Sequence, residues 1–237
     1  MKKLILLSLF MLVLCSCKKD GEYVVTGDTV CYSYWTFSFG PKQDTLYGAN
    51  AKTFKTINKW AGHDDKHVFF KAKMVEGAEA ASISAEKYPL LRDKRDYYYK
   101  GVPLHVANVD KFEVLNWSED NIWAIDGTYA FYDTVRVEGC DMASFKVKKF
   151  NVAVDRNHVY RFGKILPLAD PATYDEDWKD YYSRDKSHIW YMGTLLEDAD
   201  YNTFVVDKEQ LAHDKNGYFH RDQRITKEQY EQLEKEY

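Results

Sequence analysis

The sequence repeats itself about every thirty residues, and this period constrains the fold more than any other feature. Five residues after each member of a series of aspartates stands an aromatic residue, and eleven after each stands an aliphatic one. A period of this length is typical of repeat proteins, in which each unit buries its apolar face only by stacking on neighbours. The repetition predicts a scaffold and identifies no chemistry. The aspartates recur at intervals of 29, 33, 29, 30 and 29 residues: Asp64, Asp93, Asp126, Asp155, Asp185 and Asp214.

One repeat shows the pattern of short strands joined by turns. Residues 155–158 are turn-forming, residues 159–162 alternate between two faces, and Gly163 interrupts the alternation before residues 165–168 resume it. Alternation predicts a strand, and a glycine between two such runs predicts a tight hairpin. Each unit is therefore expected to begin with a β-hairpin.

A short helical turn and a third strand are expected after the hairpin. Asp170 and Pro171 have the N-cap residue and first-position proline of a helix start, with room for about one turn. Residues 145–150 then show how a third strand leads toward the next aspartate. The predicted fold is mainly all-β, with tandem repeats of about 30 residues in an open, solenoid-like stack. A closed propeller-like ring is the alternative, since three short strands also suit a small blade.

The two ends of the chain differ from the repeats. Residues 17–33 are polar and glycine-containing, which favours an N-terminal tether, and the repeat domain is expected over 34–225. Thr226 and Gln229 have the spacing of a capping box, so residues 226–237 are predicted to form a C-terminal helix. Repeat stacks need a cap at each end, and this helix would cover the last apolar face.

The first residues have the pattern of a bacterial lipoprotein leader. Residues 1–16 contain two lysines and an apolar run too short to span a bilayer, which predicts a secretory signal. The string Leu14-Cys15-Ser16-Cys17 resembles the lipobox, and this resemblance implies acylation of Cys17, with palmitate among the chains. Lys18 replaces the aspartate that retains such proteins at the inner membrane, so the outer membrane is the expected location. Whether the chain faces the periplasm or the exterior stays open.

Three repeats share a longer string that carries a family resemblance. The segments 93–98, 185–190 and 214–219 read DKRDYY, DKSHIW and DKNGYF, and they resemble the DKNYY family of bacterial repeat proteins, which are often lipid-anchored. The resemblance covers roughly residues 34–225, nearly the whole mature chain, with departures at Asp126 and around Trp35. It implies the repeat architecture and implies no activity.

Charge and cysteine content narrow the class of protein. The net charge is −4, and removal of the two leader lysines makes it −6, so no basic surface for nucleic acid is expected. Cys31 and Cys140 remain in the mature chain. Cys140 stands where other repeats have alanine, which favours a small buried residue over a disulfide, and the oxidation state of the pair stays open.

The titratable residues indicate a scaffold rather than a catalytic or metal site. His67, His158 and His188 all stand three residues after an anchor aspartate, as turn residues of a repeat would. The acidic run 175–177 is interpreted as solvated surface. No nucleophile elbow, phosphate loop or dinucleotide motif occurs in the sequence, so we expect no metal, no cofactor and no enzyme activity. The anchor aspartates themselves are predicted to be structural.

The clearest departure from the period is an insertion of about four residues within 115–123. Insertions in repeat proteins map to loops on one face, often the binding face, so Trp117 and Trp123 are the predicted contact residues. The expected function is a lipid-anchored, non-catalytic binding or adaptor scaffold of the cell envelope that contacts a protein or a glycan.

Three alternatives to that function stay open. The chain could be an immunity or inhibitor protein that neutralises a toxin in the envelope. It could be a glycan-binding lipoprotein, which the tryptophans suit equally well. An enzyme that uses unrecognised carboxylates is the least favoured of the three.

Overall fold

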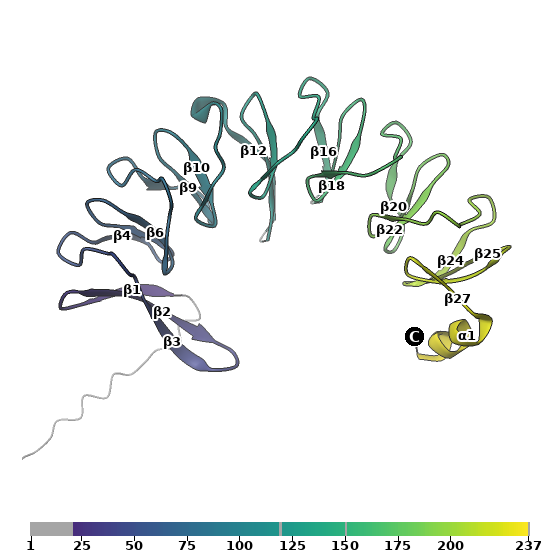
Figure 1. Cartoon of the computed structure of the whole chain (residues 1–237), viewed down its shortest axis with the longest axis horizontal. Helices are drawn as coiled ribbons and strands as arrows, with labels where there is room; N and C mark the ends of the chain where they lie inside the picture. The colour runs from purple at the N-terminus through teal and green to yellow at the C-terminus, as the bar shows by residue number, and fades with distance from the viewer. Residues whose placement is uncertain (1–20, 119, 150, 237) are drawn as a thin grey trace, which may run out of the picture. The chain divides into compact units, whose positions relative to one another are not determined.

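The protein is a series of small antiparallel β-sheets (Figure 1). A computed structural model describes residues 21–118, 120–149 and 151–236, and within these ranges there are seven sheets and one α-helix. Neighbouring strands in every sheet are consecutive in the chain, so each sheet is a simple meander. The mainly-β repeat fold predicted from the sequence is confirmed.

The chain divides into two compact units, and the N-terminal unit, Met1–Pro103, holds three of the sheets in its described part. The first sheet has three strands: β1 (Glu22–Thr26), β2 (Thr29–Thr36) and β3 (Gly40–Thr45). The second has four: β4 (Lys55–Asn58), β5 (Ala61–His63), β6 (Val68–Phe70) and β7 (Lys73–Met74). The third also has four: β8 (Ser84–Ala85), β9 (Leu90–Arg92), β10 (Tyr97–Tyr99) and β11 (Val102–Pro103).

The C-terminal unit, Leu104–Tyr237, holds four four-stranded sheets in its described part. The first contains β12 (Glu113–Trp117), β13 (Ile122–Ile125), β14 (Ala130–Tyr132) and β15 (Val135–Arg136). The second contains β16 (Lys146–Lys149), β17 (Val152–Val154), β18 (Val159–Arg161) and β19 (Lys164–Ile165). The third contains β20 (Asp175–Lys179), β21 (Tyr182–Arg184), β22 (Ile189–Tyr191) and β23 (Thr194–Leu195). The fourth contains β24 (Val205–Lys208), β25 (Leu211–Asp214), β26 (Gly217–His220) and β27 (Gln223–Ile225). Helix α1 (Lys227–Glu236) follows.

Each full repeat has four strands, one more than the sequence predicted. The additional strand is the short stretch before each anchor aspartate, such as β17, which the sequence analysis treated as a connection. Its register pairs Ala153 with Tyr160 on one side and with Val147 on the other. The anchor aspartate therefore lies in the central hairpin turn of its sheet rather than at the beginning of the unit.

The N-terminal tether predicted over 17–33 is wrong for its described part. Residues 17–20 lie outside the described residues, but β1 and the first half of β2 are paired strands from Glu22 onward. Alternation places Val30 and Tyr32 of β2 in a core shared with the next sheet, together with Phe69. A polar composition was thus compatible with a strand because one face of this sheet is open to solvent.

One of the expected helical turns is a 3₁₀ helix, and the corresponding segments of the other repeats are hydrogen-bonded turns. A 3₁₀ helix, η1 (Val109–Lys111), forms after the N-cap Asn108, whose side chain accepts a hydrogen bond from the N–H of Asp110. The corresponding segments of the other repeats are turns, as at Asp170, whose Oδ1 accepts from the N–H of Ala172 at 2.9 Å.

Apolar cores are shared between neighbouring sheets inside each unit. In the C-terminal unit, Trp123 and Tyr132 of one sheet pack in a cluster with Ala153 and Tyr160 of the next. The aromatic residue five positions after each anchor aspartate is buried in every repeat: Phe69, Tyr98, Phe131, Tyr160, Trp190 and Phe219. The period seen in the sequence is therefore the period of the core, as nearest-neighbour stacking requires.

Helix α1 begins with the predicted capping box. The Thr226 N–H donates to the side chain of Gln229 at 2.9 Å, and the Gln229 N–H donates to the Thr226 hydroxyl at 3.3 Å. Tyr230 is buried, its ring centroid lies 4.6 Å from that of Tyr218, and its hydroxyl donates to Asp207 at 2.9 Å. The helix thus packs against the last sheet through one aromatic side chain.

Glycine is required at the hairpin turn of β18–β19 for two reasons. Gly163 has a φ of +73°, which a residue with a Cβ adopts only at a cost. A Cβ at this position would also lie 2.7 Å from the Cβ of Tyr132 in the preceding sheet. Gly101 approaches Phe70 in the same way in the N-terminal unit. These turns therefore set how closely consecutive sheets approach.

We expect Gly163→Ala to lower the free energy of unfolding by about 2–4 kcal/mol, since backbone strain and overpacking add. The matched control is Gly139→Ala, where φ is +70° but the nearest atom is 3.8 Å away. This control should lose only about 1–2 kcal/mol from strain. Denaturant unfolding of both variants measures the difference, and equal losses would show that the close approach to Tyr132 contributes nothing.

Candidate functional site

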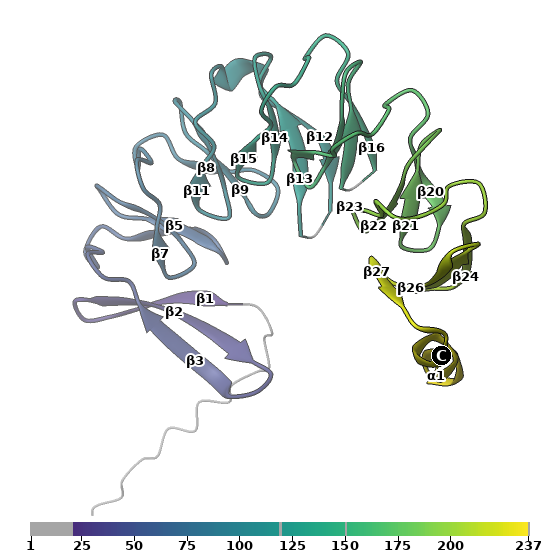
Figure 2. The same ribbon diagram turned by 45° about the vertical axis from the view of Figure 1, so that its right-hand side comes forward.

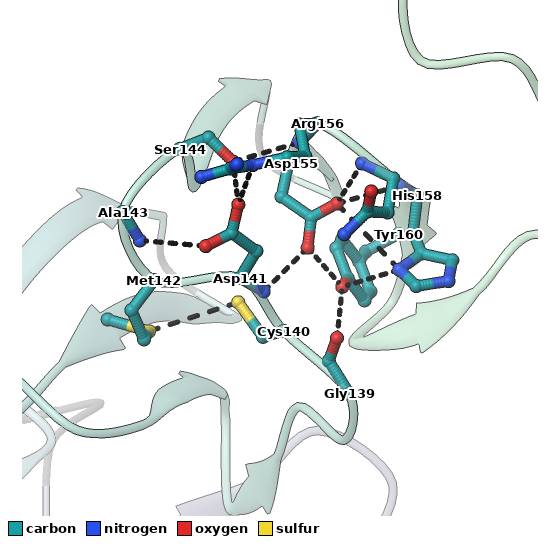
Figure 3. Close-up of polar contacts among 11 residues, drawn as sticks. Gly139, Cys140, Asp141, Met142, Ala143, Ser144, Asp155, Arg156, His158 and Tyr160 are labelled. Carbon is teal, nitrogen blue, oxygen red and sulfur yellow. Dashed lines mark hydrogen bonds and ion pairs between the residues drawn. The ribbon is translucent and has the colours of Figure 1, made fainter.

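The most regular polar feature of the molecule is the side chain of each anchor aspartate. Asp155 is buried in the turn between β17 and β18, and its Oδ1 accepts the N–H groups of Asn157 and His158, both at 2.7 Å (Figure 3). The other five anchors are also buried and make the same bond to the N–H two residues later, at 2.7–2.8 Å: Asp64, Asp93, Asp126, Asp185 and Asp214. The carboxylate thus shapes its own turn.

The second oxygen of each anchor joins this turn to a distant loop. Asp155 Oδ2 accepts the N–H of Asp141, fourteen residues earlier, at 2.8 Å, and also the hydroxyl of Tyr160 at 2.7 Å (Figure 3). The other anchors make the same long-range bond, at 2.6–2.9 Å, to the N–H groups of Asn50, Glu79, Ala107, Asp170 and Asp200. We call this arrangement the carboxylate clamp.

The clamp keeps its carboxylate ionised despite burial. Burial by itself raises the pKa of a carboxyl group, but the N–H donors, with Tyr160 at Asp155, outweigh it. The net pKa lies below the usual value in Asp64, Asp93, Asp155, Asp185 and Asp214. These aspartates are therefore acceptors at neutral pH, with no proton to donate to a substrate.

A charged pair on the surface of the clamp was missed by the sequence analysis. Lys215, the residue after an anchor, contacts the carboxylate of Asp200 at 2.6 Å, and its N–H donates to Thr203 at 3.1 Å. Equivalent pairs join Lys94 to Glu79, Arg156 to Asp141 and Lys186 to Asp170. The signal was present in the sequence, because a cation follows the anchor wherever an acid stands 14 or 15 residues before it.

The histidines that follow the anchors belong to the same turns. His188 Nδ1 lies 3.3 Å from Asp185 Oδ2, and His158 and His67 are placed similarly beside Asp155 and Asp64. Among the described residues, no group of three or more His, Cys, Asp or Glu side chains is arranged to hold a metal ion. Each of these histidines contacts its own anchor.

The two tryptophans predicted as contact residues are not an exposed pair. Trp123 is 0% exposed and lies in the core of its sheet, so its assignment as a contact residue is wrong. Trp117 is half-buried at the end of β12, where it pairs with Ile122. The inserted residues lengthen the β12–β13 hairpin, and Asn116 pairs directly with Trp123. An insertion that continues a strand pairing makes no separate binding loop.

A cleft of about 880 Å³ in the N-terminal unit is the best candidate for a ligand site. It lies along the three sheets of that unit, and its aromatic wall includes Trp60, Phe70 and Tyr88. The Trp60 ring centroid lies 5.4 Å from that of Tyr88 and 5.5 Å from that of Phe70. Trp35 and Tyr34 of β2 also line it. The volume is within the range of small-molecule sites.

The rim of the cleft is basic. Among the described residues, Lys59, Lys71, Lys73 and Lys100 line it, against one acidic side chain, Asp44. The Lys71 ammonium lies 6.0 Å from the Tyr88 ring centroid, so charge and ring present one surface. A hydrogen bond to Asp44 raises the pKa of the Tyr34 phenol, which therefore stays protonated. This chemistry suits a ligand that combines a flat or apolar face with negative charge.

The remaining predicted positions carry little chemistry. Cys31 and Cys140 are free thiols, and burial raises the pKa of Cys140 to about 12, which suppresses the reactive thiolate. Cys17 and the predicted signal lie outside the described residues. In the described part of the chain, none of the helices has the length and apolar character of a membrane span.

Comparison with known proteins identifies the repeats. A model of the DKNYY family matches residues 25–164, which is more than half of the chain. The match begins inside β1, so it agrees with the paired strands found there. No curated protein and no solved structure gives a significant match.

We expect Asp155→Asn to lower the free energy of unfolding at pH 7 by about 2–4 kcal/mol, because it leaves buried N–H donors poorly paired. A carboxyl with a depressed folded-state pKa stabilises fully above its unfolded-state pKa of about 3.9. That stabilisation is lost as the pH falls through the lower folded-state pKa. The gap between wild type and variant should therefore shrink below about pH 4.

Denaturant unfolding from pH 7 to pH 3 measures this dependence. Asp198→Asn is the matched control, since Asp198 is exposed in the same unit, and it should change stability by less than about 0.5 kcal/mol. A gap for Asp155→Asn that stays constant across this range would show that the carboxylate charge is not what the clamp uses.

Proposed function

The chain belongs to the DKNYY family, and from that premise we propose that it is a lipid-anchored, non-catalytic binding protein of the bacterial cell envelope that takes its ligand in the cleft of the N-terminal unit. The observation that carries the proposal is the aromatic wall of this cleft beside four lysines. Concave sites that combine rings with a few charged groups are typical of ligand binding.

The repeat framework supports a binding role rather than catalysis. The buried carboxylates act as hydrogen-bond acceptors within the clamp and have depressed pKa values, whereas a general acid at neutral pH needs a raised one. The cleft itself is lined by lysines, aromatic rings and Asp44. These groups recognise charge and apolar surface.

The anchor is proposed from the leader sequence. The apolar run of residues 4–14 ends in the lipobox-like string before Cys17, and acyl chains on that cysteine would hold the chain at a membrane. Lys18 after the cysteine favours the outer membrane.

Two kinds of ligand fit this cleft. The first candidate is an acidic segment of a protein partner, and the second is an anionic glycan. The specific observation is that Phe70 and Tyr88 are stacked, with ring centroids 6.3 Å apart, and Lys71 lies over both rings. Phe70 is buried beneath this stack, but Tyr88 is 42% exposed, and its exposed ring suits the apolar face of a sugar, while the lysines suit carboxylate or phosphate substituents on it.

For the anchor, we expect wild-type chain to incorporate labelled palmitate and to sediment with membranes. Cys17→Ser should abolish the label and release the protein into the soluble fraction, because one residue carries the acyl chains. Cys15→Ser, two residues earlier, is the control and should behave as wild type. Unchanged labelling in Cys17→Ser would refute the proposed anchor.

For the cleft, we expect the double variant Lys71→Glu/Lys73→Glu to weaken ligand binding by roughly tenfold or more, since two attractive charges become repulsive. The matched control reverses two exposed lysines with the same spacing on β16, Lys146→Glu/Lys148→Glu. Binding is measured on a glycan array and by affinity capture from envelope extracts.

The outcomes separate the two ligand classes. Array binding that only the cleft variant loses supports the glycan, and a single captured protein that only the cleft variant loses supports a protein partner. Equal loss in both variants would refute the cleft as the site and indicate a general charge effect.

A further inference from the structure

We propose that the tip of the β2–β3 hairpin inserts into the surface of the lipid bilayer as a second membrane contact beside the N-terminal acyl chains. The tip is the loop of residues 37–39, where Phe37 is fully exposed and Phe39 is 75% exposed. Rings this exposed would break few packing contacts within the protein on entering a bilayer, and their transfer from water to an apolar medium is favourable.

The hairpin tip is held in one conformation by its own hydrogen bonds. The Thr36 hydroxyl donates to the carbonyl of Gly40 at 3.0 Å and accepts the N–H of Phe39 at 3.2 Å. Gly40, the first residue of β3, has a φ of +70°, a conformation that glycine adopts without steric cost. The two rings are thus displayed by an ordered turn, and little conformational entropy is lost when they insert.

The direction of the strands places the tip and the N-terminal end of β1 at the same end of the sheet. β1 is antiparallel to β2, and Glu22 pairs with Ser33, so the N-terminal end of β1 lies at the end of the sheet that carries the tip (Figure 2). Phe37 lies four residues beyond Ser33, which is about 13 Å of strand. Cys17 lies five residues before Glu22, and that stretch reaches at most about 17 Å. The hairpin tip and an acylated Cys17 can therefore reach the same membrane surface.

The chemistry of the tip favours lipid over the other possible occupants. Two phenylalanine rings offer no hydrogen bond to a sugar, and they bury about 300–500 Å² together, which is below the roughly 800 Å² per partner of a stable protein interface. Lys42 lies 4.8 Å from the Phe39 ring centroid, so a cation stands just behind the apolar tip. Apolar rings followed by a basic side chain match the order of acyl chains and anionic headgroups.

The orientation proposed for the tip rests on the lipid anchor of the proposed function. The experiment, however, tests the tip in a protein that has no lipid anchor. The protein used in this test comprises residues 17–237 and carries Cys17→Ser, so it has no acyl chain. The probe is vesicles of phosphatidylethanolamine and phosphatidylglycerol. Co-sedimentation should show binding with the native tip, and Phe37→Ser/Phe39→Ser should weaken it by at least about tenfold. Thermal unfolding of the variant should match that of the native chain, because neither ring packs on the sheet.

The matched control is Tyr47→Ser, which removes an exposed aromatic side chain after the opposite end of β3 and should leave vesicle binding unchanged. Three results would overturn the inference: no vesicle binding with the native tip, equal binding with and without the rings, or binding that appears only when membrane proteins are added. Palmitate labelling of Cys17 is a separate measurement, so a failed anchor with tip-dependent vesicle binding refutes the anchor alone.

Discussion

The buried carboxylate of the anchor aspartate is the interaction on which the rest of the fold depends. It accepts N–H groups from its own turn and from a loop 14 to 19 residues earlier, so it fixes two segments that share no strand pairing. A buried charge is stable only when hydrogen bonds replace its hydration, and here the backbone supplies them in every repeat. Strands of two to five residues are too short to hold such sheets alone, and the clamp adds a long-range constraint to each.

The clamp and the buried aromatic residues occupy the same positions in each repeat, and the contact surfaces that we propose are features that the repeats do not share. The N-terminal unit contains both of the proposed contact surfaces: a first sheet of three strands with a projecting hairpin, and a cleft with an aromatic wall and a basic rim. Neither the exposed Phe37 nor the lysines of the cleft contribute to a core cluster. The exposed and charged residues of these surfaces are therefore separable from the framework, whereas Trp60 and Phe70 of the cleft wall also belong to the core.

Two predictions made from the sequence are wrong for the same physical reason. Trp123 was assigned to a binding loop because it lies in an insertion, yet the inserted residues extend a hairpin whose alternation turns Trp123 inward. Residues 22–33 were assigned to a tether because they are polar, yet β1 pairs with β2, β2 pairs with β3, and Val30 and Tyr32 share a core with the following repeat. In both cases the hairpin is local, but its burial is completed by residues of the next sheet, which are distant in the chain and leave no record in a local pattern.

The sequence by itself determined the repeat period, the buried aromatic and aliphatic positions, the β-hairpins, and the capping box of α1, because each depends on contacts within a few residues or on a spacing that recurs. Only the tertiary structure decided which N–H groups reach each carboxylate, which rings line the cleft, and which aromatic residues point to solvent. Those outcomes depend on how sheets stack, and stacking is a sum of contacts between segments that the linear sequence separates.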